Sequence, residues 1–338
     1  MSYERSATIE ALRLRAGVLA RLRAFFAARS VLEVETPALS PAGVTDPALA
    51  NIAAEVRSLG GIHYLHTSPE FAMKRLLADG VGDIYQICRV FRDDELGRRH
   101  QPEFTLLEWY RVGWNDERLM DEVAEAAYAA LDRTARDWPV VRLSYREAFV
   151  RATGVDPLSE IDAPLRERLD GLGVEVPAGL DAEALLDLAF GTVVEPALPR
   201  EALTFIYDYP AAQAALAKLK PGRPPVAARF ELFAGGVELA NGFAELTDAA
   251  EQRRRFAADR LKRQRQGRPE VPMDEDFLAA LEAGLPECAG VALGVDRLVA
   301  LAAGATHLAE VLAFTHRPRR DSAANAQAKK GSDSLAKS

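Results

Sequence analysis

The spacing of apolar residues predicts a helix near the start of the chain and two strands close to residue 100. From Ile9 to Arg29 apolar residues recur every three or four positions, which is the period of one helix face. Ile84–Arg92 and Glu103–Arg111 are instead rich in β-branched and aromatic residues, which favour half-buried strands. Because the stretch 93–101 between them is polar and contains Gly97, we expect the two strands to form a hairpin.

The alternation of side chains along this hairpin predicts which residues share a face. One strand places Gln86, Cys88, Val90 and Arg92 on one face, and its partner places Phe104, Leu106, Glu108 and Tyr110 on one face. Arginine, carboxylate, histidine and aromatic side chains then gather at one place. Such a set is either a salt-bridged surface hairpin or a binding site.

A second hairpin is predicted around Gly235-Gly236, because glycine tolerates positive φ at both central positions of a two-residue turn. This turn pairs Phe233 with Glu238 and Glu231 with Ala240, so that both glutamates lie on one face. Two like charges there are unfavourable without a cation, and carboxylates combined with phosphate oxygens suit Mg²⁺. The alternative is a pair of solvated glutamates.

Asn241-Gly242 predicts a break in the second strand of this hairpin, followed by Glu245. A helix that Asp248 caps comes next, and its basic run 253–268 is typical of a solvated face. The alternative is a docking surface for an acidic or RNA-like partner.

Two further segments frame these hairpins. Before the first one, a short strand at His63–Thr67 leads into a helix that begins with Ser68-Pro69-Glu70, where Glu70 is either a capping acid or a ligand for a substrate. After the last helix, Glu310–Phe314 predicts a closing strand, and residues 317–338 predict a disordered basic tail.

Composition describes an ordinary globular protein of 338 residues with 49% hydrophobic and 27% charged residues. The net charge of −8 argues against broad electrostatic binding of nucleic acid. Two cysteines cannot build a disulfide framework, which favours a reducing cytoplasm. There is no secretory signal, no apolar run approaches the roughly 20 residues of a membrane span, and the chain lacks the P-loop pattern GxxxxGK[ST].

The segment FRDDELGRRHQPEFTLLEWY, residues 91–110, closely resembles motif 2 of the class II aminoacyl-tRNA synthetases, in the lysine-specific subgroup. The helix at Ile9–Arg29 and the following VLEVETPALSP resemble motif 1, and GVALGVDRLVAL at Gly290–Leu301 resembles motif 3. The resemblance covers residues 8–316. It implies an α+β fold, a catalytic core with an antiparallel sheet flanked by helices, over residues 1–316, with 139–228 as an insertion between motifs 2 and 3. It also implies a homodimer formed through motif 1.

The resemblance implies activation of lysine as an adenylate with ATP and Mg²⁺, and it assigns roles to individual residues. Arg92 and Arg297 would be catalytic and hold phosphates, while Glu231 and Glu238 would hold Mg²⁺. The amino acid would be bound by Ser68, Pro69, Glu70, Tyr110, Glu245 and Ala292, with Glu70 on the α-ammonium and Glu245 and Tyr110 on the distal ammonium. The nucleotide would contact Arg92, Asp93, Asp94, His100, Gln101, Phe104, Glu238, Leu239, Gly294 and Arg297, with Phe104 stacked on adenine. The family commonly has Glu and Asn where this chain has Asp94 and Gln101.

The sequence leaves no room for the N-terminal anticodon-binding domain of the lysine-specific synthetases. It therefore resembles the truncated paralogues that attach lysine or β-lysine to a lysine side chain of elongation factor P, with tRNA not expected as a partner. Ala292 stands where the tRNA-charging enzymes have Gly, and Ser68 replaces a small apolar residue, which is compatible with β-lysine. The alternatives are a minimal enzyme that acylates tRNA or another amine, and a non-catalytic paralogue. The non-catalytic alternative is disfavoured because Arg92, Glu231, Glu238 and Arg297 are all present.

Overall fold

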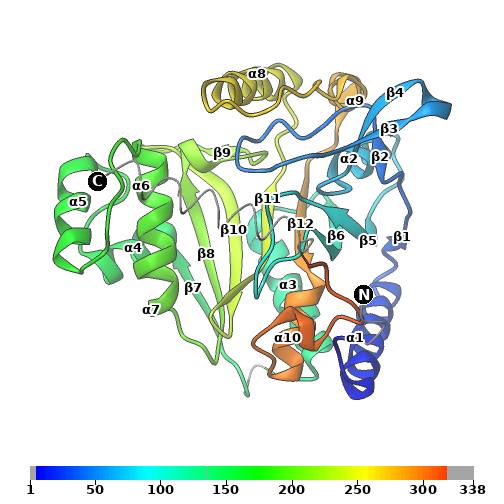
Figure 1. Cartoon of the computed structure of the whole chain (residues 1–338), viewed down its shortest axis with the longest axis horizontal. Helices are drawn as coiled ribbons and strands as arrows, with labels where there is room; N and C mark the ends of the chain where they lie inside the picture. Colours follow the sequence, from blue (N-terminus) through cyan, green and yellow to red (C-terminus); the bar gives the residue numbers. More distant parts are fainter. Residues whose placement is uncertain (1–4, 135, 318–338) are drawn as a thin grey trace, which may run out of the picture.

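The computed structural model describes residues 5–134 and 136–317, so almost all of the predicted tail lies outside the described residues. Its centre is a nine-stranded sheet in the order β1-β5-β6-β12-β11-β10-β8-β7, with β9 paired to β10 (Figure 1). Neighbours run antiparallel except β1–β5 and β7–β8, which run parallel. The strands are β1 (Leu32–Glu33), β5 (Ile84–Phe91), β6 (Glu103–Val112), β7 (Val140–Ser144), β8 (Leu203–Pro210), β9 (Leu219–Lys220), β10 (Val226–Ala234), β11 (Val237–Ala244) and β12 (Cys288–Gly294). This arrangement confirms the α+β prediction.

The motif 2 hairpin, β5 with β6, brings the two predicted faces together. Gln86 pairs with Glu108, and Val90 pairs with Phe104, so the two predicted faces coincide. β12 lies on the other side of β6 and pairs Gly290 with Tyr110. Motifs 2 and 3 are therefore adjacent strands of one sheet, although about 180 residues separate them in the sequence.

The second hairpin, β10 with β11, differs from the prediction in two places. The Gly235-Gly236 turn and the pairing of Phe233 with Glu238 are confirmed. However, Glu231 pairs with Asn241 instead of Ala240, because a β-bulge between Leu232 and Phe233 shifts the register by one residue.

The predicted strand break at Asn241-Gly242 is also wrong, since β11 runs through both residues. Gly242 serves packing instead: a Cβ there would lie 2.4 Å from Cζ of Phe230. The glycine makes room for a buried ring on the neighbouring strand.

Three helices cover one face of the sheet: α1 (Ile9–Ala27), α3 (Asp116–Leu131) and α10 (Val295–Ala303) (Figure 1). The predicted apolar face of α1 buries Val18, Leu22 and Phe26 in the main core, together with residues from the sheet and the other two helices. α1 begins where Thr8 accepts a hydrogen bond from the Ala11 amide, as an N-cap residue does.

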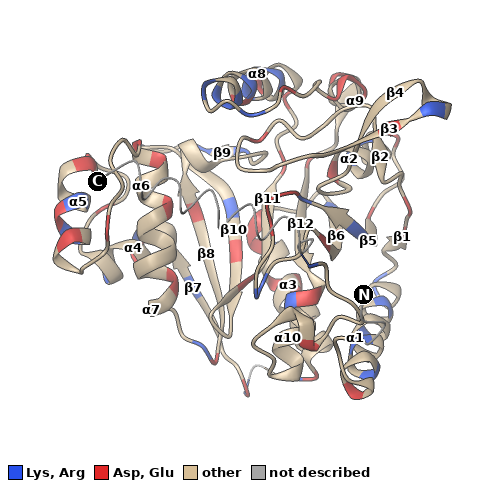
Figure 2. Ribbon diagram, in the orientation of Figure 1, with Lys and Arg blue, Asp and Glu red and all other residues tan. Residues whose placement is uncertain are grey.

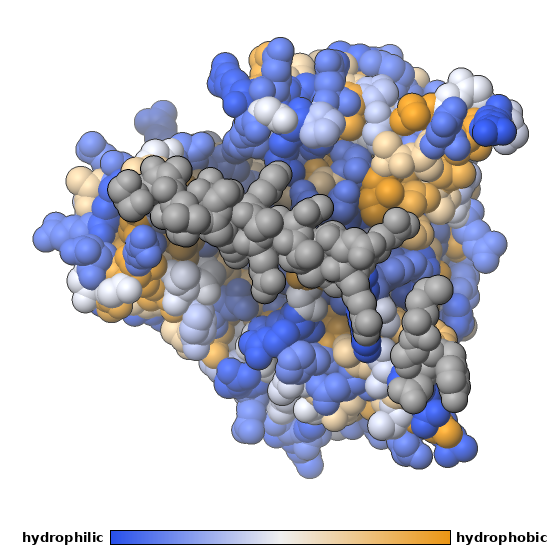
Figure 3. All heavy atoms as spheres, in the orientation of Figure 1, coloured by the Kyte–Doolittle hydropathy of each residue, from blue (hydrophilic) through white to orange (hydrophobic). Residues whose placement is uncertain are grey.

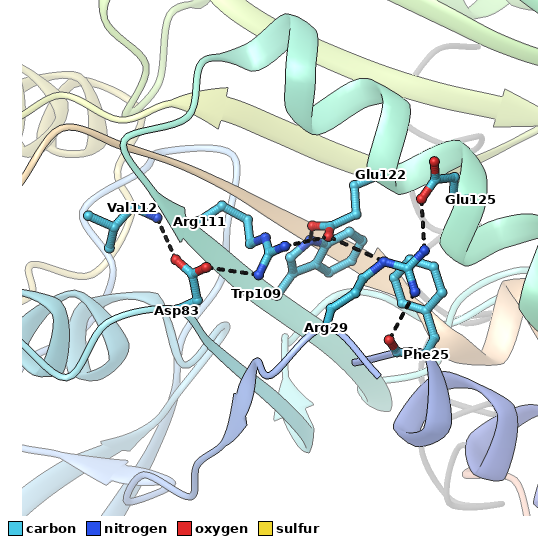
Figure 4. A network of polar contacts seen from close by, with 8 residues as sticks. All are labelled: Phe25, Arg29, Asp83, Trp109, Arg111, Val112, Glu122 and Glu125. Carbon is cyan, nitrogen blue, oxygen red and sulfur yellow. Dashed lines mark hydrogen bonds and ion pairs between the residues drawn. The ribbon is translucent and has the colours of Figure 1, made fainter. Parts of the chain in front are cut away.

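A polar network around Trp109 and Arg111 holds one face of β6 (Figure 4). Strand alternation places Glu108 and Tyr110 on the opposite face. Arg111 donates to Asp83 at 2.8 Å and forms an ion pair with Glu122 at 3.0 Å. Glu122, which lies on α3, also accepts a hydrogen bond from the indole of Trp109 at 3.1 Å. The strand that carries the motif 2 residues is thereby held rigidly against α3.

The opposite face carries a small sheet and three helices. The sheet has the order β2-β4-β3, and the elements are β2 (Leu39–Ser40), β3 (Ile52–Val56), β4 (Gly61–Leu65), α2 (Glu70–Ala78), α8 (Ala249–Arg265) and α9 (Glu275–Gly284). α2 and α9 share a separate apolar cluster that includes Met73, Phe277 and Leu281.

Helix α8 contains the predicted basic run, which appears as a blue cluster in Figure 2. Most of its cations are engaged within the chain: Arg253 binds Glu275, Arg254 and Arg255 bind Glu251, Arg260 binds Glu270, Lys262 binds Glu183, and Arg263 donates to three backbone carbonyls. Arg253, Arg260, Lys262 and Arg263 therefore connect α8 to other segments, and the docking alternative stays a prediction.

Residues 139–228, the predicted insertion, contribute strands to the main sheet. β7 and β8 complete the edge of the main sheet, while α4 (Tyr145–Thr153), α5 (Asp162–Gly171) and α6 (Ala182–Ala189) cover it with a second apolar cluster. The short α7 (Glu195–Ala197) precedes β8. β8 is followed by a short helical turn at Ala211–Gln213.

The predicted closing strand at Glu310–Phe314 is wrong. Leu312 and Ala313 instead accept backbone hydrogen bonds from Ala7 and Ser6, without forming a strand. Both cysteines are free, as predicted. Within residues 5–134 and 136–317, no helix has the length and apolar character to cross a membrane.

Candidate active site

A cavity of about 510 Å³ lies between the central sheet and the small sheet with helices α2 and α8. Its wall contains most of the residues predicted to bind substrates: Ser68, Pro69, Glu70, Arg92, His100, Gln101, Phe104, Tyr110, Glu238, Leu239, Glu245, Ala292, Gly294 and Arg297. They come from the start of α2, the loop between β5 and β6, the strands β6, β11 and β12, the residue after β11, and the start of α10. Three neighbouring strands and their connections therefore bring distant segments of the sequence to one site.

Three predicted residues do not line this cavity. Asp93 and Asp94 are exposed on the loop that follows β5, and Asp94 has a positive φ of 63°. The carboxylate of Glu231 is held by two neighbours: it accepts from the Tyr209 hydroxyl at 2.6 Å and pairs with Arg229 at 2.5 Å.

One end of the cavity is acidic, and its centre is Glu108, which is 2% exposed. One oxygen of this carboxylate accepts from the Tyr110 hydroxyl at 2.5 Å, and the other accepts from the Ser68 hydroxyl at 2.7 Å. Ser68 also accepts from the Glu70 amide at 3.0 Å, so it links the start of α2 to β6. The predicted residues Ser68, Glu70 and Tyr110 thus surround an acid to which the sequence analysis gave no role.

The carboxylates of Glu70 and Glu245 both contact the ammonium group of Lys74. Its Nζ lies 2.6 Å from Glu70 Oε1 and 2.5 Å from Glu245 Oε2. Lys74 and Glu245 are each 1% exposed. Burial alone would lower the pKa of Lys74, but the two carboxylates outweigh it and raise the pKa, so Lys74 is charged.

Burial also raises the pKa values of the acidic groups at this end of the cavity. Loss of hydration raises the pKa of Glu108 to about 8, with the nearby Glu70 adding to the shift. It raises the pKa of Glu245 to about 7, although Lys74 opposes the change. Burial and the Glu108 charge keep the pKa of Tyr110 far above its ordinary value. These acids therefore attract either protons or ammonium groups near neutral pH.

The other end of the cavity is built around Arg297, in the first turn of α10. Its guanidinium donates to the carbonyl of Glu238 at 2.9 Å, pairs with the Glu238 carboxylate at 3.3 Å, and lies 2.7 Å from Nε2 of His100. Partial desolvation and Arg297 lower the pKa of His100, so the neutral ring can accept this hydrogen bond. The Arg297 side chain is 23% exposed and thus accessible from the cavity.

The start of α10 is fixed by Asp296, which is 2% exposed. This carboxylate accepts from Arg15 of α1 at 2.6 Å and from the Thr105 amide of β6 at 3.1 Å. Motifs 1, 2 and 3 therefore meet at one side chain. Directly after β5, Arg92 donates to the Thr67 carbonyl at 3.3 Å, and its guanidinium lies 5.0 Å from the centre of the Phe104 ring.

Comparison with known proteins decides what these three motifs mean. A family model described as tRNA synthetases class II (D, K and N) matches residues 1–318. The chain belongs to the class II tRNA synthetases. It is also 49% identical over 322 residues to proteins of Salmonella typhi, Salmonella paratyphi B and Salmonella heidelberg, each named elongation factor P–(R)-β-lysine ligase. These matches cover 93% of this chain and 97% of each relative.

Class II synthetases use ATP with Mg²⁺, and the chain offers a partial set of metal ligands. Among the described residues, no three His, Cys, Asp or Glu side chains form a cluster that could hold a metal alone. Mg²⁺ commonly takes only one or two carboxylates together with substrate phosphates. Glu238, whose side chain is 39% exposed in the cavity wall, fits that role. Glu231 lies on the same face of the hairpin but is held by Arg229, so its metal role stays a prediction.

Sequence reasoning missed the roles of two residues in this class II site, Glu108 and Lys74. The signal for Glu108 was present, because strand alternation places it on the face of Tyr110. The signal for Lys74 was its position one turn after Glu70, but such a spacing equally describes a solvated surface pair. Only the packing of α2 against α9 shows that Lys74 is buried.

Proposed function

We propose that this protein activates lysine or β-lysine with ATP and transfers it to a lysine side chain of elongation factor P. The observation that carries this proposal is the polarity of the cavity. Glu70, Glu108 and Glu245 lie at one end, where they suit the ammonium groups of a diamino acid. Arg92 and Arg297 lie at the other end, where they suit phosphates.

In the first step, a carboxylate oxygen of the amino acid attacks the α-phosphorus of ATP, and pyrophosphate leaves. No protein nucleophile is needed, so the chain contributes positioning and charge stabilisation. Arg297 and Arg92 would bind phosphate oxygens, and Phe104 would stack on the adenine ring. Mg²⁺, held by Glu238 and with Glu231 as the predicted second ligand, would neutralise phosphate charge.

In the second step, the ε-amine of the acceptor lysine attacks the carbonyl carbon of the adenylate. An amide forms and AMP leaves. The names of the three Salmonella relatives, at 49% identity over nearly their full length, support elongation factor P as acceptor and β-lysine as donor. Ala292 lines the cavity and pairs across the sheet with Glu108, so its methyl group lies where it can affect ammonium placement.

The intact mass of purified elongation factor P from the same organism tests this proposal. Incubation with this protein, Mg²⁺-ATP and α- or β-lysine should add one lysyl residue, and the faster isomer identifies the natural donor. A reaction without ATP is the control. Lysine attached instead to RNA, in a bond that is labile at alkaline pH, would favour the tRNA alternative. Unchanged elongation factor P despite active pyrophosphate exchange would exclude it as the acceptor.

The raised pKa values of Glu108 and Glu245 predict how lysine binding depends on pH. Below pH 7 protons compete with the substrate for both carboxylates, whereas at pH 8 Glu245 is ionised and Glu108 ionises readily. The side-chain ammonium of lysine stays protonated over this range. The KM for lysine should therefore fall by at least about tenfold from pH 6 to pH 8.

This pH dependence is measured by ATP–pyrophosphate exchange at saturating ATP, with lysine varied at each pH. If protons compete with lysine for these two carboxylates, the KM for ATP should change much less than the KM for lysine. Equal values of the lysine KM at pH 6 and pH 8 would show that these acids do not bind the substrate.

A homodimer and a cytoplasmic location remain proposals. Motif 1 and the small sheet expose large apolar side chains, namely Leu32, Leu39, Leu59 and Ile62, each at least 36% exposed. Figure 3 shows apolar residues gathered over β2–β4. Such a patch is typical of an interface, which the molar mass in solution would reveal. The two free cysteines are typical of a reducing compartment.

A further inference from the structure

Lys74 is a charged residue buried in the apolar cluster that α2 and α9 share. It is 1% exposed and lies among Met73, Leu77 and Phe277, whose ring centre is 5.8 Å from Nζ. An apolar side chain of similar length would pack there without the cost of removing a charge from water. The burial of a lysine therefore calls for an electrostatic reason.

The surrounding charges supply that reason. Three buried or nearly buried carboxylates, Glu70, Glu108 and Glu245, converge on the acidic end, and Lys74 is the cation that contacts two of them. Ligand ammonium groups favour the ionised form of all three carboxylates, and together with Lys74 the ionised carboxylates then carry two net negative charges. An amino acid with two ammonium groups matches that balance, whereas a pocket without Lys74 would keep one buried carboxylate unpaired.

The geometry also shows how Lys74 leaves each acid available to a ligand. Lys74 occupies Oε1 of Glu70 and Oε2 of Glu245, one oxygen of each carboxylate. The remaining Oε1 of Glu245 lies beside Gly290, only 2.4 Å from where a Cβ would stand. Gly290 and Glu245 both line the cavity, so this oxygen faces the side from which a substrate arrives.

We propose that Lys74 is a positioning residue that orients Glu70 and Glu245 and sets the charge of the pocket to match a diamino acid. This inference rests on the proposed function, because it assumes that lysine or β-lysine is the substrate. Lys74 contacts the two acids and not the ligand. It acts by favouring the ionised form of Glu245, against the effect of burial, and by fixing which oxygen of each carboxylate points into the cavity.

A matched control exists on β9. Lys220 also bridges two carboxylates, with Nζ 2.6 Å from Asp116 and 2.7 Å from Asp208, but it lies outside the cavity wall. Lys74→Gln and Lys220→Gln remove the same type of bridge. Only Lys74→Gln should alter the KM for lysine, while both variants can lower the melting temperature.

The experiment measures ATP–pyrophosphate exchange with lysine as the varied substrate, from pH 6 to pH 9. Lys74→Gln should raise the KM for lysine about 10- to 100-fold, the range for loss of a charge-assisted contact, with a much smaller change in kcat. The acid limb of kcat/KM, which reports free-enzyme groups, should move to higher pH, because Glu245 loses its cation. The other groups at this acid are Glu70 on α2, Glu108 and Tyr110 on β6 and Cys288 on β12, and none of them is changed.

Several outcomes would overturn the inference. A folded Lys74→Gln variant with the wild-type KM and acid limb would do so, as would a Lys220→Gln variant with the same shifts. If Lys74→Gln does not fold, Lys74→Arg decides, because it keeps the charge and should keep the acid limb; a limb displaced upward would contradict the inference. Wild-type protein that shows no lysine-dependent exchange would instead refute the proposed function, and the inference with it.

Discussion

Arg297→Ala is expected to lower lysine-dependent ATP–pyrophosphate exchange by at least about 1,000-fold. The guanidinium is the cation in the first turn of α10, anchored by Glu238 and His100 and accessible from the cavity. Its removal takes away a fixed positive charge at the position where, in the proposed reaction, phosphate charge would develop, and alanine offers no replacement. The loss should appear in kcat, since a group that binds the reacting phosphates acts mainly in the transition state.

Arg142→Ala is the matched control for this variant. Arg142 lies on β7 and pairs with Asp121 at 2.6 Å, outside the cavity wall. It should leave exchange within about twofold, because an exposed ion pair contributes little. Melting temperatures of both variants separate a catalytic loss from an unfolded protein. Exchange near the wild-type rate in Arg297→Ala would show that the motif 3 assignment is wrong.

Gly290→Ala is expected to remove the use of lysine while leaving ATP binding intact. A Cβ at this position would lie 2.3 Å from Cε1 of Tyr110 and 2.4 Å from Oε1 of Glu245. Neither side chain can retreat, since Tyr110 is 2% and Glu245 is 1% exposed. The backbone cannot shift either, because β12 is paired with β11 on one side and with β6 on the other. We expect the KM for lysine to rise at least about 100-fold, since a displaced carboxylate loses a charge-assisted contact.

Gly171→Ala is the control for the added methyl group. Gly171 lies at the end of α5 with no heavy atom within 4 Å of the new Cβ and without a positive φ. The exchange assay with lysine, together with calorimetric titration of ATP, separates the two ends of the cavity. Loss of ATP binding in Gly290→Ala would mean that the methyl group disturbs the whole sheet, and an unchanged lysine KM would place the amino-acid pocket elsewhere.

The sequence predicted those parts of the site that depend on local pattern. The polar loop between two β-rich segments was sufficient to predict the motif 2 hairpin, and the period-2 alternation predicted which residues share a face of each strand. The residues transferred from motifs 2 and 3 mostly reached one cavity, since these motifs correspond to adjacent strands. Their roles as ligands stay predictions.

The errors arose where tertiary packing decides the local structure. The bulge that moves Glu231 opposite Asn241 leaves no mark on composition. Gly242 resembles a strand breaker, yet it continues β11 because the ring of Phe230 needs its space. Lys74 resembles a surface helix residue, and its burial depends on α9, which begins about 200 residues later. None of these facts can be obtained from a window of neighbouring residues.

The proposed amino-acid pocket draws its wall from segments spread over most of the described chain, from Ser68 to Ala292. During synthesis this pocket cannot exist until β12 and α10, close to the end of the described residues, have left the ribosome. An incomplete nascent chain therefore cannot activate an amino acid. Once the wall has assembled, a bound ligand connects early and late segments. Saturating lysine and ATP should therefore stabilise the whole protein against global unfolding, and not only one loop.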